Sequence, residues 1–556
     1  MSKHIRYPFF FLIILCILLI SSDHSLNATT SDKRLATSDK FTLTIAHVND
    51  THAHIEPSKL KLTIGDQNVK VEAGGLARLV TKAKQLRADN KNFLFLHAGD
   101  LFQGTLYFKL FNGFADKYFF ELAGLDAMVV GNHEFDSGIP ALENFSSKAA
   151  FPLLSANMNM NTADNLRKHI KPYIIKIISG EKIGIIGLTT PDTANISLGA
   201  KNVTFQDPLA TTRKYTQELK AKGVNKIILL THLGFEEDIA LATKITDVDV
   251  IVGGHSHTSL GDFTTIGLPT KNEYPYIVKD ALNKDVLIIQ AWNFAYLMGV
   301  LSVTFDQHGY ITNYQGHPLL MIAKTDNLPT LPHVEEIAED EQAKEKQKEF
   351  TAKLKKLRNN TVATTTEDLI RGINTGPGPI IADAMLWKTR ALKVVASIIN
   401  PGGTRDDLFT GPITIADAYK VLPFENTYIV LDLTGDEIIK VIEDNATVQI
   451  KKDRVLPVNV ANLKYDVLMK NQAGNRIQNV LIKNEKHLYV PIDKNKTYRI
   501  VTINFLAQGG DYNHTLKNAK GYRYDTGFIE TEGFIDYLRK KKDILNNTEE
   551  RITIIN

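Results

Sequence analysis

The sequence predicts a layered α/β protein with two domains. Apolar and β-branched runs alternate with segments of helical period up to about residue 325, a pattern typical of stacked strands and helices. The chain has 556 residues, which is more than one hydrophobic core usually organises. Its composition changes at residues 334–359, and a second α/β segment starts near residue 364. This change marks the expected connection between the domains.

Composition narrows the class of protein. An apolar fraction of 43% and a charged fraction of 23% are typical of a folded soluble chain and exclude wholesale disorder. The formal net charge is only +3, so no basic field is available to bind a nucleic acid polymer. A single nucleotide is still compatible with this charge, because a local pair of arginines can bind it.

The N-terminus is predicted to be a signal peptide over residues 1–28, followed by a mobile polar leader over 29–40. Basic residues precede an apolar run at 9–20, which is shorter than the roughly 20 residues of a membrane span. An uncleaved anchor is the alternative, since no clear small-x-small cleavage site follows. We expect a periplasmic or secreted protein without a stable membrane anchor. The one cysteine, Cys16, lies in the apolar run, so a mature chain would lack disulfides and thiolate ligands.

Six runs in the first domain are predicted strands, because β-branched and apolar residues dominate them. They cover 41–47, 92–97, 126–130, 182–189, 225–231 and 248–252. Between the first two, apolar residues recur at helical spacing from Leu76 to Leu86. We expect a first domain at 41–325, a helical linker at 326–362 and a smaller second domain at 363–545. The charged, glycine-free stretch at 334–359 suits a solvated helix.

Candidate metal ligands follow the ends of these runs. In layered α/β folds, ligands collect in the crevice beyond the carboxyl ends of the strands, so side chains at these positions are expected to converge. The residues that follow five of the runs are Asp50, Asp100, Asn132, His232 and His255.

These residue types suit two divalent ions roughly 3.5–4 Å apart, which lower the pKa of a shared water and clamp phosphoryl oxygens. Such a pair needs one bridging carboxylate with oxygen and imidazole ligands on each side. The first ion is assigned Asp50, His52 and His257, the second Asn132, His232 and His255, and the bridge Asp100, which follows a glycine. Zn, Mn, Co and Mg all accept such ligands, so the metal is left open.

One histidine is predicted to act on the substrate instead. His133 directly follows Asn132 and would point away from the ion, so it is a candidate acid for the leaving oxygen. Asp136 lies three positions on and is expected to orient this imidazole. His47, His54 and His97 fit no ligand position and are expected to have supporting roles.

The ordered motifs resemble the calcineurin-like metallophosphoesterases. These motifs are Asp-x-His, Gly-Asp, Gly-Asn-His-Glu, Thr-His and Gly-His-x-His, beginning at residues 50, 99, 131, 231 and 254. This resemblance implies a four-layer sandwich, in which helices flank two β-sheets, joined by a helical linker to a smaller α/β substrate-binding domain.

The second half is similar to the 5′-nucleotidase/UDP-sugar hydrolase family. The segments that carry this resemblance are Asn400–Arg405, Leu422–Phe424 and Asn504–Asp511. It implies that Phe424 and Phe505 sandwich the base, Asp511 binds ribose hydroxyls, Arg371 and Arg405 hold phosphate, and Asn400 assists at the base or phosphate. Aromatic faces stack on any base, and arginine meets phosphate with a bidentate fork. Pro379, Pro401 and Tyr512 depart from the family pattern, and Tyr512 follows Asp511 where glycine is common.

The resemblance implies a two-metal 5′-nucleotidase that converts nucleoside 5′-monophosphates to nucleoside and phosphate. Nucleoside di- and triphosphates and UDP-sugars are further candidate substrates. It also implies that the second domain carries the nucleoside to the metals. Two alternatives are open: a 2′,3′-cyclic-nucleotide 2′-phosphodiesterase with 3′-nucleotidase activity, and a non-catalytic extracellular nucleotide-binding protein. The sequence leaves the oligomeric state open.

Overall fold

The computed structural model describes residues 40–159, 164–200, 202–325, 328–358, 360–424, 426–451, 457–547 and 549–555. The predicted signal peptide, Cys16 and the leader up to residue 39 lie outside these ranges. Within them, no helix combines the length and the apolar character that crossing a bilayer requires.

The first domain contains a mixed ten-stranded sheet. Its central strand, β1 (Phe41–Val48), is buried along almost its whole length and pairs antiparallel with β16 and parallel with β4. The spatial order is β2 (Ser58–Ile64), β3 (Gln67–Ala73), β17 (Ile311–Ile322), β16 (Leu297–Phe305), β1, β4 (Phe93–His97), β5 (Ala127–Val129), β6 (Leu153–Leu154) and β8 (Ile170–Lys171), with β18 (Val334–Glu336) beside β17.

A second sheet of six strands faces the first. Four of its strands run parallel, and they are apolar on both faces because each face is covered. The order is β14 (Tyr276–Lys279), β15 (Asp285–Ile289), β13 (Val250–Val252), β12 (Lys226–His232), β10 (Glu181–Thr189) and β9 (Tyr173–Ile178). All six strands predicted from the sequence are therefore present, with ends shifted by one or two residues.

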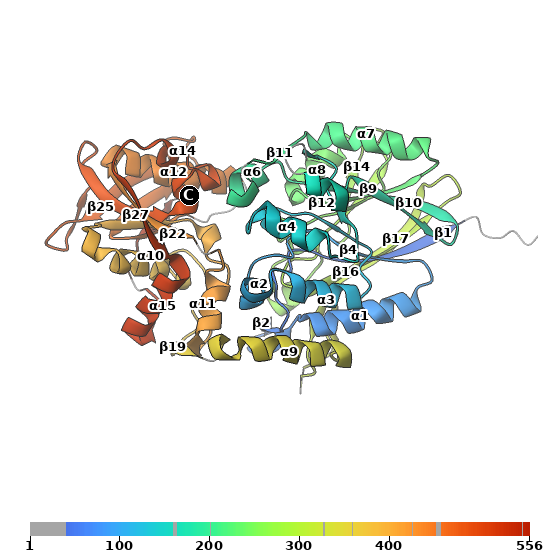
Figure 1. Ribbon diagram of the computed structural model, residues 1–556, viewed down its shortest axis with the longest axis horizontal. Helices are drawn as coiled ribbons and strands as arrows, with labels where there is room; N and C mark the ends of the chain where they lie inside the picture. The colour runs from blue at the N-terminus through green and yellow to red at the C-terminus, as the bar shows by residue number, and fades with distance from the viewer. Residues whose placement is uncertain are drawn as a thin grey trace, which may run out of the picture. The chain divides into compact units, whose positions relative to one another are not determined.

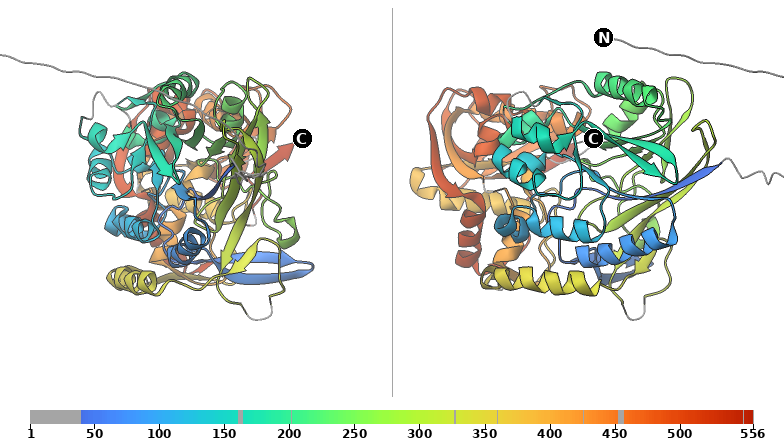
Figure 2. Two further views of the ribbon diagram at one scale, coloured as in Figure 1. Left: turned by 90° about the vertical axis from the view of Figure 1, so that its right-hand side faces the viewer. Right: turned by 45° about the vertical axis from the view of Figure 1, so that its right-hand side comes forward.

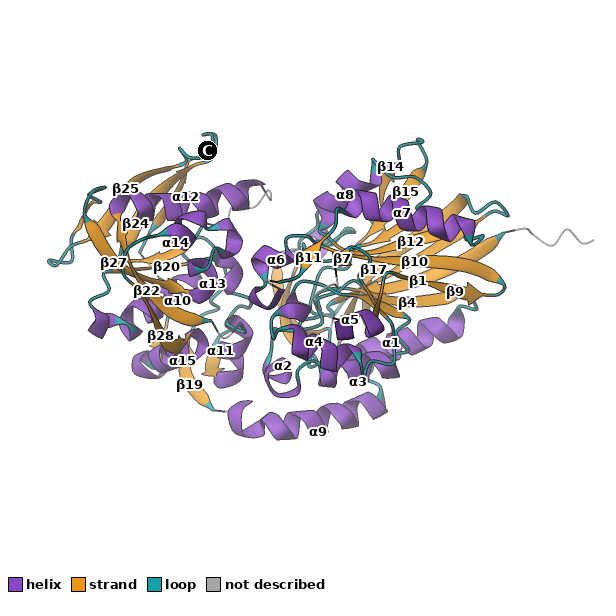
Figure 3. Ribbon diagram, turned by 45° about the horizontal axis from the view of Figure 1, so that its top comes forward, coloured by secondary structure: helices purple, strands orange, loops and turns teal. Residues whose placement is uncertain are grey.

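The two sheets and their helices form the expected four layers. Side chains of both sheets, such as Ile45 and Ile228, make one core between them. Helices α1 (Leu76–Asp89), α2 (Leu106–Phe111), α3 (Phe114–Leu122) and α4 (Ile139–Ser146) cover the outer face of the first sheet, and α7 (Pro208–Ala221) and α8 (Phe235–Ala242) cover the second (Figure 3). Shorter elements connect these layers: η1 (His133–Phe135), α5 (Asp164–His169), α6 (Thr193–Ile196), η2 (Leu198–Ala200), β7 (Met158–Asn159), β11 (Thr204–Phe205) and η3 (Thr264–Ile266).

The charged stretch is helical only in part. Val334–Glu336 forms β18, since Val334 pairs with Leu320 of β17, and the helix α9 starts at Glu341 and ends at Arg358. The side chain of Asp340 accepts a hydrogen bond from the Ala343 N–H and so caps the helix. The prediction of helix from residue 334 was therefore wrong for its first residues. α9 packs along α1, α2 and α3, and Figures 1 and 2 show it beside α1.

The second domain is an α/β unit with its own core. A five-stranded sheet has the order β23 (Asn459–Ala461), β20 (Ala396–Ile399), β27 (Thr497–Ile503), β22 (Thr427–Thr434) and β28 (Arg523–Ile529). A four-stranded sheet has β26 (Tyr489–Pro491), β25 (Ile477–Lys483), β24 (Leu463–Leu468) and β30 (Ile552–Ile555), and a three-stranded sheet has β21 (Gly411–Thr414), β19 (Thr361–Thr365) and β29 (Asp543–Ile544). Its helical segments are α10 (Pro377–Lys388), α11 (Ile415–Val421), α12 (Gly435–Lys451), α13 (Asn504–Ala507), α14 (His514–Asn518), α15 (Glu530–Lys541), η4 (Arg390–Leu392), η5 (Pro401–Gly403) and η6 (Gly510–Tyr512).

The chain from Lys40 onward forms one compact unit. One core cluster, to which α10, α11, α12 and α15 contribute, is shared by the sheets of the second domain. Since β30 pairs with β24, the second domain includes strand residues beyond position 545.

Candidate active site

The predicted ligands come from loops at one edge of the two sheets. β1, β4 and β5 run parallel, and so do β12 and β13, so their carboxyl ends point the same way. Asp50, Asp100 and Asn132 follow the first three strands, His232 ends β12, and His255 follows β13. The topology therefore brings together residues that lie more than 200 positions apart.

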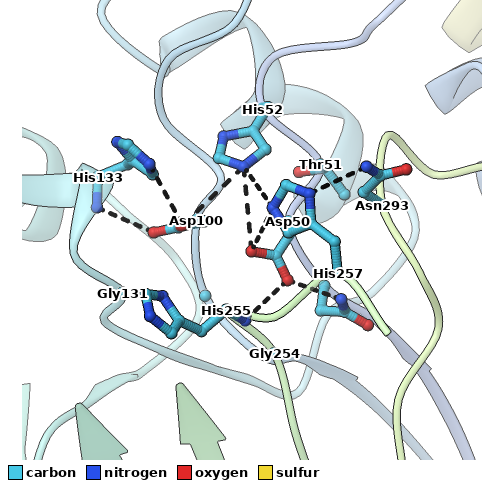
Figure 4. Close-up of polar contacts among 12 residues, drawn as sticks. Asp50, Thr51, His52, Asp100, Gly131, His133, Gly254, His255, His257 and Asn293 are labelled. Atoms are coloured by element: carbon cyan, nitrogen blue, oxygen red, sulfur yellow. Dashed lines mark hydrogen bonds and ion pairs between the residues drawn. The ribbon is translucent and has the colours of Figure 1, made fainter. Parts of the chain in front are cut away.

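Two groups of ligand atoms form at this edge. One contains Asp50, His52 and His257, and the other contains Asp100, His232 and His255, with the ligand atoms of each group within 4.8 Å of one another. Asp100 also groups with His52 and His133, so its carboxylate lies beside both sets (Figure 4). Asn132 Oδ1 lies 2.9 Å from His255 Nδ1 and 3.2 Å from His232 Nε2. All seven predicted ligands are therefore brought together.

Backbone carbonyls orient two of the imidazoles. A carbonyl oxygen can only accept, so Nδ1–H of His52 donates to Phe102 O at 3.0 Å and Nδ1–H of His232 donates to Ala98 O at 2.7 Å. In its neutral form, each ring would then present an unprotonated Nε2 to the centre, as a metal ligand must. The amide of Asn293 contacts Nδ1 of His257 at 3.0 Å and orients the third ring.

The donor set fits divalent cations. Oδ1 of Asp50 is buried and accepts no hydrogen bond, although it lies 3.1 Å from His257 Nε2. Nε2 of His52 and Nε2 of His257 face each other at 3.2 Å. Burial lowers the pKa of His232, but the Asp100 carboxylate outweighs it and raises the pKa to about 10, so the site attracts positive charge. Buried carboxylates and imidazoles that point at one another are stabilised when cations lie between them.

The ligand loops have unusual backbones. Asp50, His52, Asp100, His255 and His257 all have positive φ, between 47° and 74°, which costs energy for residues with a side chain. Neighbouring glycines permit close approach: a Cβ on Gly131 would lie 2.3 Å from Asp100 Oδ1, and one on Gly254 would lie 2.3 Å from Ala98 O. The glycines of the sequence motifs are therefore required by space.

A buried carboxylate joins two ligand loops. Glu134 is fully buried, and its two oxygens accept four backbone N–H groups, at 2.6–3.0 Å, from Asp100, Leu101, Phe102 and Gly131. The sequence motif contained Glu134, but sequence reasoning gave it no role. Its carboxylate fixes the loop of Asp100 to the loop of Asn132.

Two further supports were not predicted at all. Gln290 is buried, accepts from the Ser256 hydroxyl at 3.0 Å and from the Thr258 N–H, and donates to Gly254 O at 3.2 Å. Asn49 donates to Asp50 Oδ2 at 2.7 Å. The three histidines expected to have supporting roles are buried and bonded to neighbours: His47 to Tyr274, His54 to the His52 carbonyl, and His97 to Thr51.

His133 and Asp136 form a pair. Nδ1 of His133 lies 2.6 Å from Oδ2 of Asp136, and its Nε2 lies 3.9 Å from Asp100 Oδ2. Burial lowers the pKa of His133, yet the charges of Asp136 and Asp100 outweigh this and raise it above 6.5. The other ring nitrogen, Nε2, faces the centre, and the raised pKa favours the protonated ring.

A cavity of about 780 Å³ opens onto this centre. Its lining includes ligands and the His133–Asp136 pair, as well as all six residues predicted to bind substrate: Arg371, Asn400, Arg405, Phe424, Phe505 and Asp511. Nη2 of Arg405 lies 3.2 Å from His52 Nε2, and its guanidinium lies over the Phe424 ring at 5.4 Å. The Phe424 ring stacks on the His133 ring with centroids 5.4 Å apart.

The remaining predicted substrate residues hold one another in place. Asn400 donates to Asp511 Oδ2 at 2.6 Å, and Arg371 is half exposed and pairs with Asp407 at 3.1 Å. A Cβ on Gly510 would lie 2.6 Å from the Phe505 ring, so that ring packs closely against the backbone before Asp511. Among the departures, Pro379 lies in the first turn of α10, Pro401 begins η5, and Tyr512 has a φ of 58°.

A four-layer α/β sandwich with carboxylates and imidazoles at its strand ends defines a calcineurin-like phosphoesterase. Residues 43–259 match the family model described as calcineurin-like phosphoesterase, and residues 357–518 match the 5′-nucleotidase C-terminal domain. The chain belongs to the 5′-nucleotidase family and is a metal-dependent phosphomonoester hydrolase.

Three relatives illustrate this membership. A probable 5′-nucleotidase of Treponema pallidum is 33% identical, over 92% of this chain and 94% of that protein. An NAD 5′-nucleotidase of Haemophilus influenzae is 32% identical, over 90% of each. The crystal structure of a 5′-nucleotidase precursor from Thermus thermophilus matches with a TM-score of 0.87 and 42% identity, covering 93% of this chain and all of that one.

Proposed function

We propose that this protein is a periplasmic or secreted two-metal 5′-nucleotidase that hydrolyses nucleoside 5′-monophosphates to nucleoside and phosphate. The observation that carries the proposal is the shared cavity. Residues suited to binding a base, a ribose and a phosphate line the same 780 Å³ space as the carboxylate and imidazole cluster. A nucleotide has all three parts, whereas a simple phosphate ester has no base to stack on Phe424 and Phe505 and no ribose hydroxyls to reach Asp511.

The metal roles follow from the two groups of ligand atoms. Asp50, His52 and His257 would hold one ion, Asn132, His232 and His255 the other, and Asp100 would contact both. When bound, such ions supply a nucleophile at neutral pH and neutralise charge on the phosphoryl oxygens. Zn, Mn, Co and Mg all suit these donors.

The protein residues around the phosphoryl group would complete the chemistry. His133 would donate the proton on Nε2 to the leaving oxygen while Asp136 holds Nδ1–H at 2.6 Å. Arg405 and Arg371 would bind phosphoryl oxygens, and Arg405, whose Nη2 lies 3.2 Å from His52 Nε2, would bring its positive charge close to the ions. Removal of His133 should lower turnover far more than nucleotide affinity.

The nucleoside would bind on the side of the second domain. Phe424 and Phe505 offer aromatic faces for the base, a contact worth roughly 1–3 kcal/mol per stacked ring, which tolerates several bases. Asp511 would accept hydrogen bonds from ribose hydroxyls, and Asn400 holds its carboxylate at 2.6 Å. We assign these roles to the second domain, predicted at residues 363–545 and extended by β30 to Ile555, which is linked through 326–362 to the metal domain at 41–325.

A panel of substrates tests the proposal. Phosphate release is measured from AMP, 3′-AMP, ATP, UDP-glucose, NAD and 2′,3′-cyclic AMP, each with Zn, Mn, Co or Mg restored after chelation. We expect AMP to give the highest kcat/KM. Release from 3′-AMP and the cyclic nucleotide but not from AMP would favour the cyclic phosphodiesterase. Bound metal without any hydrolysis would favour the non-catalytic nucleotide-binding protein.

A matched pair of variants separates catalysis from binding. His133→Ala should lower kcat by a factor on the order of 10²–10⁴, the usual contribution of a general acid, with a small change in KM. His308→Ala replaces an exposed histidine in a surface turn and should behave as the unmodified protein. Equal losses in kcat and in nucleotide affinity for His133→Ala would contradict the assigned role.

A further inference from the structure

Ser197 hydrogen-bonds to Asp136 of the His133–Asp136 pair, at the carboxylate oxygen that does not contact His133. Its hydroxyl donates to Oδ1 of Asp136 at 2.7 Å, while Oδ2 of the same carboxylate receives His133 Nδ1–H at 2.6 Å. The residue directly follows α6 and is only 2% exposed. The chain Ser197–Asp136–His133 therefore leads from the protein interior to the reacting centre.

We infer that Ser197 is a positioning residue for the proton donor of the reaction. This inference rests on the proposed role of His133. The Asp136 side chain lines the cavity and is 12% exposed, so its carboxylate has water on one side. A carboxylate held at one oxygen only can rotate about its Cβ–Cγ bond. The Ser197 hydroxyl fixes the second oxygen, and Oδ2 then stays directed at Nδ1 of His133.

The segment that carries Ser197 packs against the turn that carries His133. A Cβ on Gly199 would lie 1.7 Å from the Phe135 carbonyl oxygen, so η2 is pressed against η1, the turn that contains His133. The Ser197 N–H donates to Thr193 O at 3.0 Å, and the Thr193 hydroxyl donates to Thr190 O at 2.7 Å. The hydroxyl of Ser197 is thus fixed relative to the histidine turn by packing and by backbone hydrogen bonds.

The orientation of the Asp136 carboxylate decides where Nε2 of His133 points. The Asp136 carboxylate accepts from Nδ1–H, which leaves the Nε2 position of His133 directed at the centre, near Asp100 Oδ2 at 3.9 Å. If Asp136 turned away, the ring could rotate or change tautomer, and fewer molecules would hold the proton where the leaving oxygen lies. Within the described ranges, the Ser197 side chain hydrogen-bonds to Asp136 and to none of the seven predicted metal ligands, so its removal should leave metal binding unchanged.

The test is Ser197→Ala in the full metal-loaded chain. The substitution removes one hydrogen bond, from the Ser197 hydroxyl to Asp136, and leaves His133 and Asp136 in place. We therefore expect kcat for AMP to fall about 3- to 30-fold, with KM, metal content and melting temperature unchanged. With p-nitrophenyl phosphate, whose leaving group needs no proton, the loss should shrink. Ser397→Ala is the matched control, because Ser397 is a buried serine of the second domain that donates to the Ala382 carbonyl.

A double-mutant cycle between Ser197 and Asp136 tests whether Ser197 acts by positioning Asp136 or only by filling space in the core. In the double-mutant cycle, Ser197→Ala should add little to Asp136→Asn, because both act through the same imidazole. The low-field proton resonance of His133 Nδ1–H, assigned as the one lost in His133→Ala, should weaken or shift in Ser197→Ala. Additive effects, an unchanged resonance, or an equal loss with both substrates would overturn the inference. If Ser197→Ala fails to fold, Ser197→Cys is measured in the same way, with a smaller loss expected.

These readouts distinguish the inference from the proposed function. Failure to hydrolyse AMP would refute the nucleotidase proposal, whereas the resonance and its dependence on Ser197 are measured without turnover. A working nucleotidase with no response to Ser197→Ala would refute the positioning role alone.

Discussion

Replacing Glu134 with glutamine tests how the metal loops are held. The substitution keeps Oε1, which accepts from Leu101 and Phe102, and turns Oε2 into an amide that faces the N–H groups of Asp100 and Gly131. Two hydrogen bonds to a charged acceptor are lost at about 1.5–3 kcal/mol each. We therefore expect the free energy of unfolding to fall by about 3–6 kcal/mol in the metal-loaded protein, with weaker metal binding.

Metal occupancy should change the size of this effect. Burial and the neighbouring Asp100 carboxylate raise the pKa of Glu134, and cations bound to Asp100 remove the second cause. The loss should therefore be smaller in chelator, where two buried carboxylates repel each other. Urea unfolding followed by circular dichroism, with and without metal, measures both values, and calorimetric titration measures metal affinity.

A second buried glutamate provides the control for Glu134→Gln. Glu443 accepts backbone N–H groups from Gly474, Arg476 and Ile477 in the second domain, away from the metals. Glu443→Gln should lower stability similarly and leave metal affinity unchanged. The reasoning fails if Glu134→Gln costs less than about 1 kcal/mol with metal present, or if both variants weaken metal binding equally.

Three further outcomes are expected. Gly131→Ala should abolish metal binding and activity, since its Cβ would lie 2.3 Å from Asp100 Oδ1. The control Gly180→Ala has open space and a φ of 89°, so it should cost only the roughly 1–2 kcal/mol of backbone strain. Metal analysis and melting curves check both variants. Burial raises the pKa of Glu530 from 4.5 to about 8, so the folded state keeps a proton that the unfolded state releases, and stability falls as pH rises from about 4.5 to about 8. Glu530→Gln should remove this slope, so the free energy of unfolding gained by the substitution should be about 4 kcal/mol larger at pH 8.5 than at pH 4. Urea unfolding at both pH values measures this gain, and an unchanged slope would contradict the assignment. Phe505→Ala should raise KM for AMP about 5- to 100-fold, as expected for one lost stacking contact, and an unaltered KM would exclude the ring from the base site.

The sequence predicted the first domain well because its strands are continuous apolar runs. Buried parallel strands such as Lys226–His232 carry this pattern regardless of their neighbours. The start of α9 was misplaced because Val334–Glu336 gains its strand pairing from β17, a partner that is remote in sequence. Local charge pattern alone favoured helix there.

The convergence of the predicted ligands could be read from the sequence, whereas the residues that support them could not. Asp50, Asp100 and His255 lie in short motifs directly after apolar runs, and the structure brings them together. Ser197 and Gln290 lie in no motif, and only the packing of distant segments gives them their partners. A single serine or glutamine in a sequence carries no signal of which carboxylate or loop it will meet.

The positive φ angles of five predicted ligand residues limit how this site can change over evolution. Glycine, asparagine and aspartate adopt such angles at the lowest cost, and β-branched residues adopt them at the highest. A lineage that abandoned catalysis could therefore exchange His52 or His257 for asparagine or glycine and keep the loops intact. Exchange for valine or isoleucine would disturb the loops as well as the chemistry, so relatives that have lost activity should show the first kind of replacement before the second.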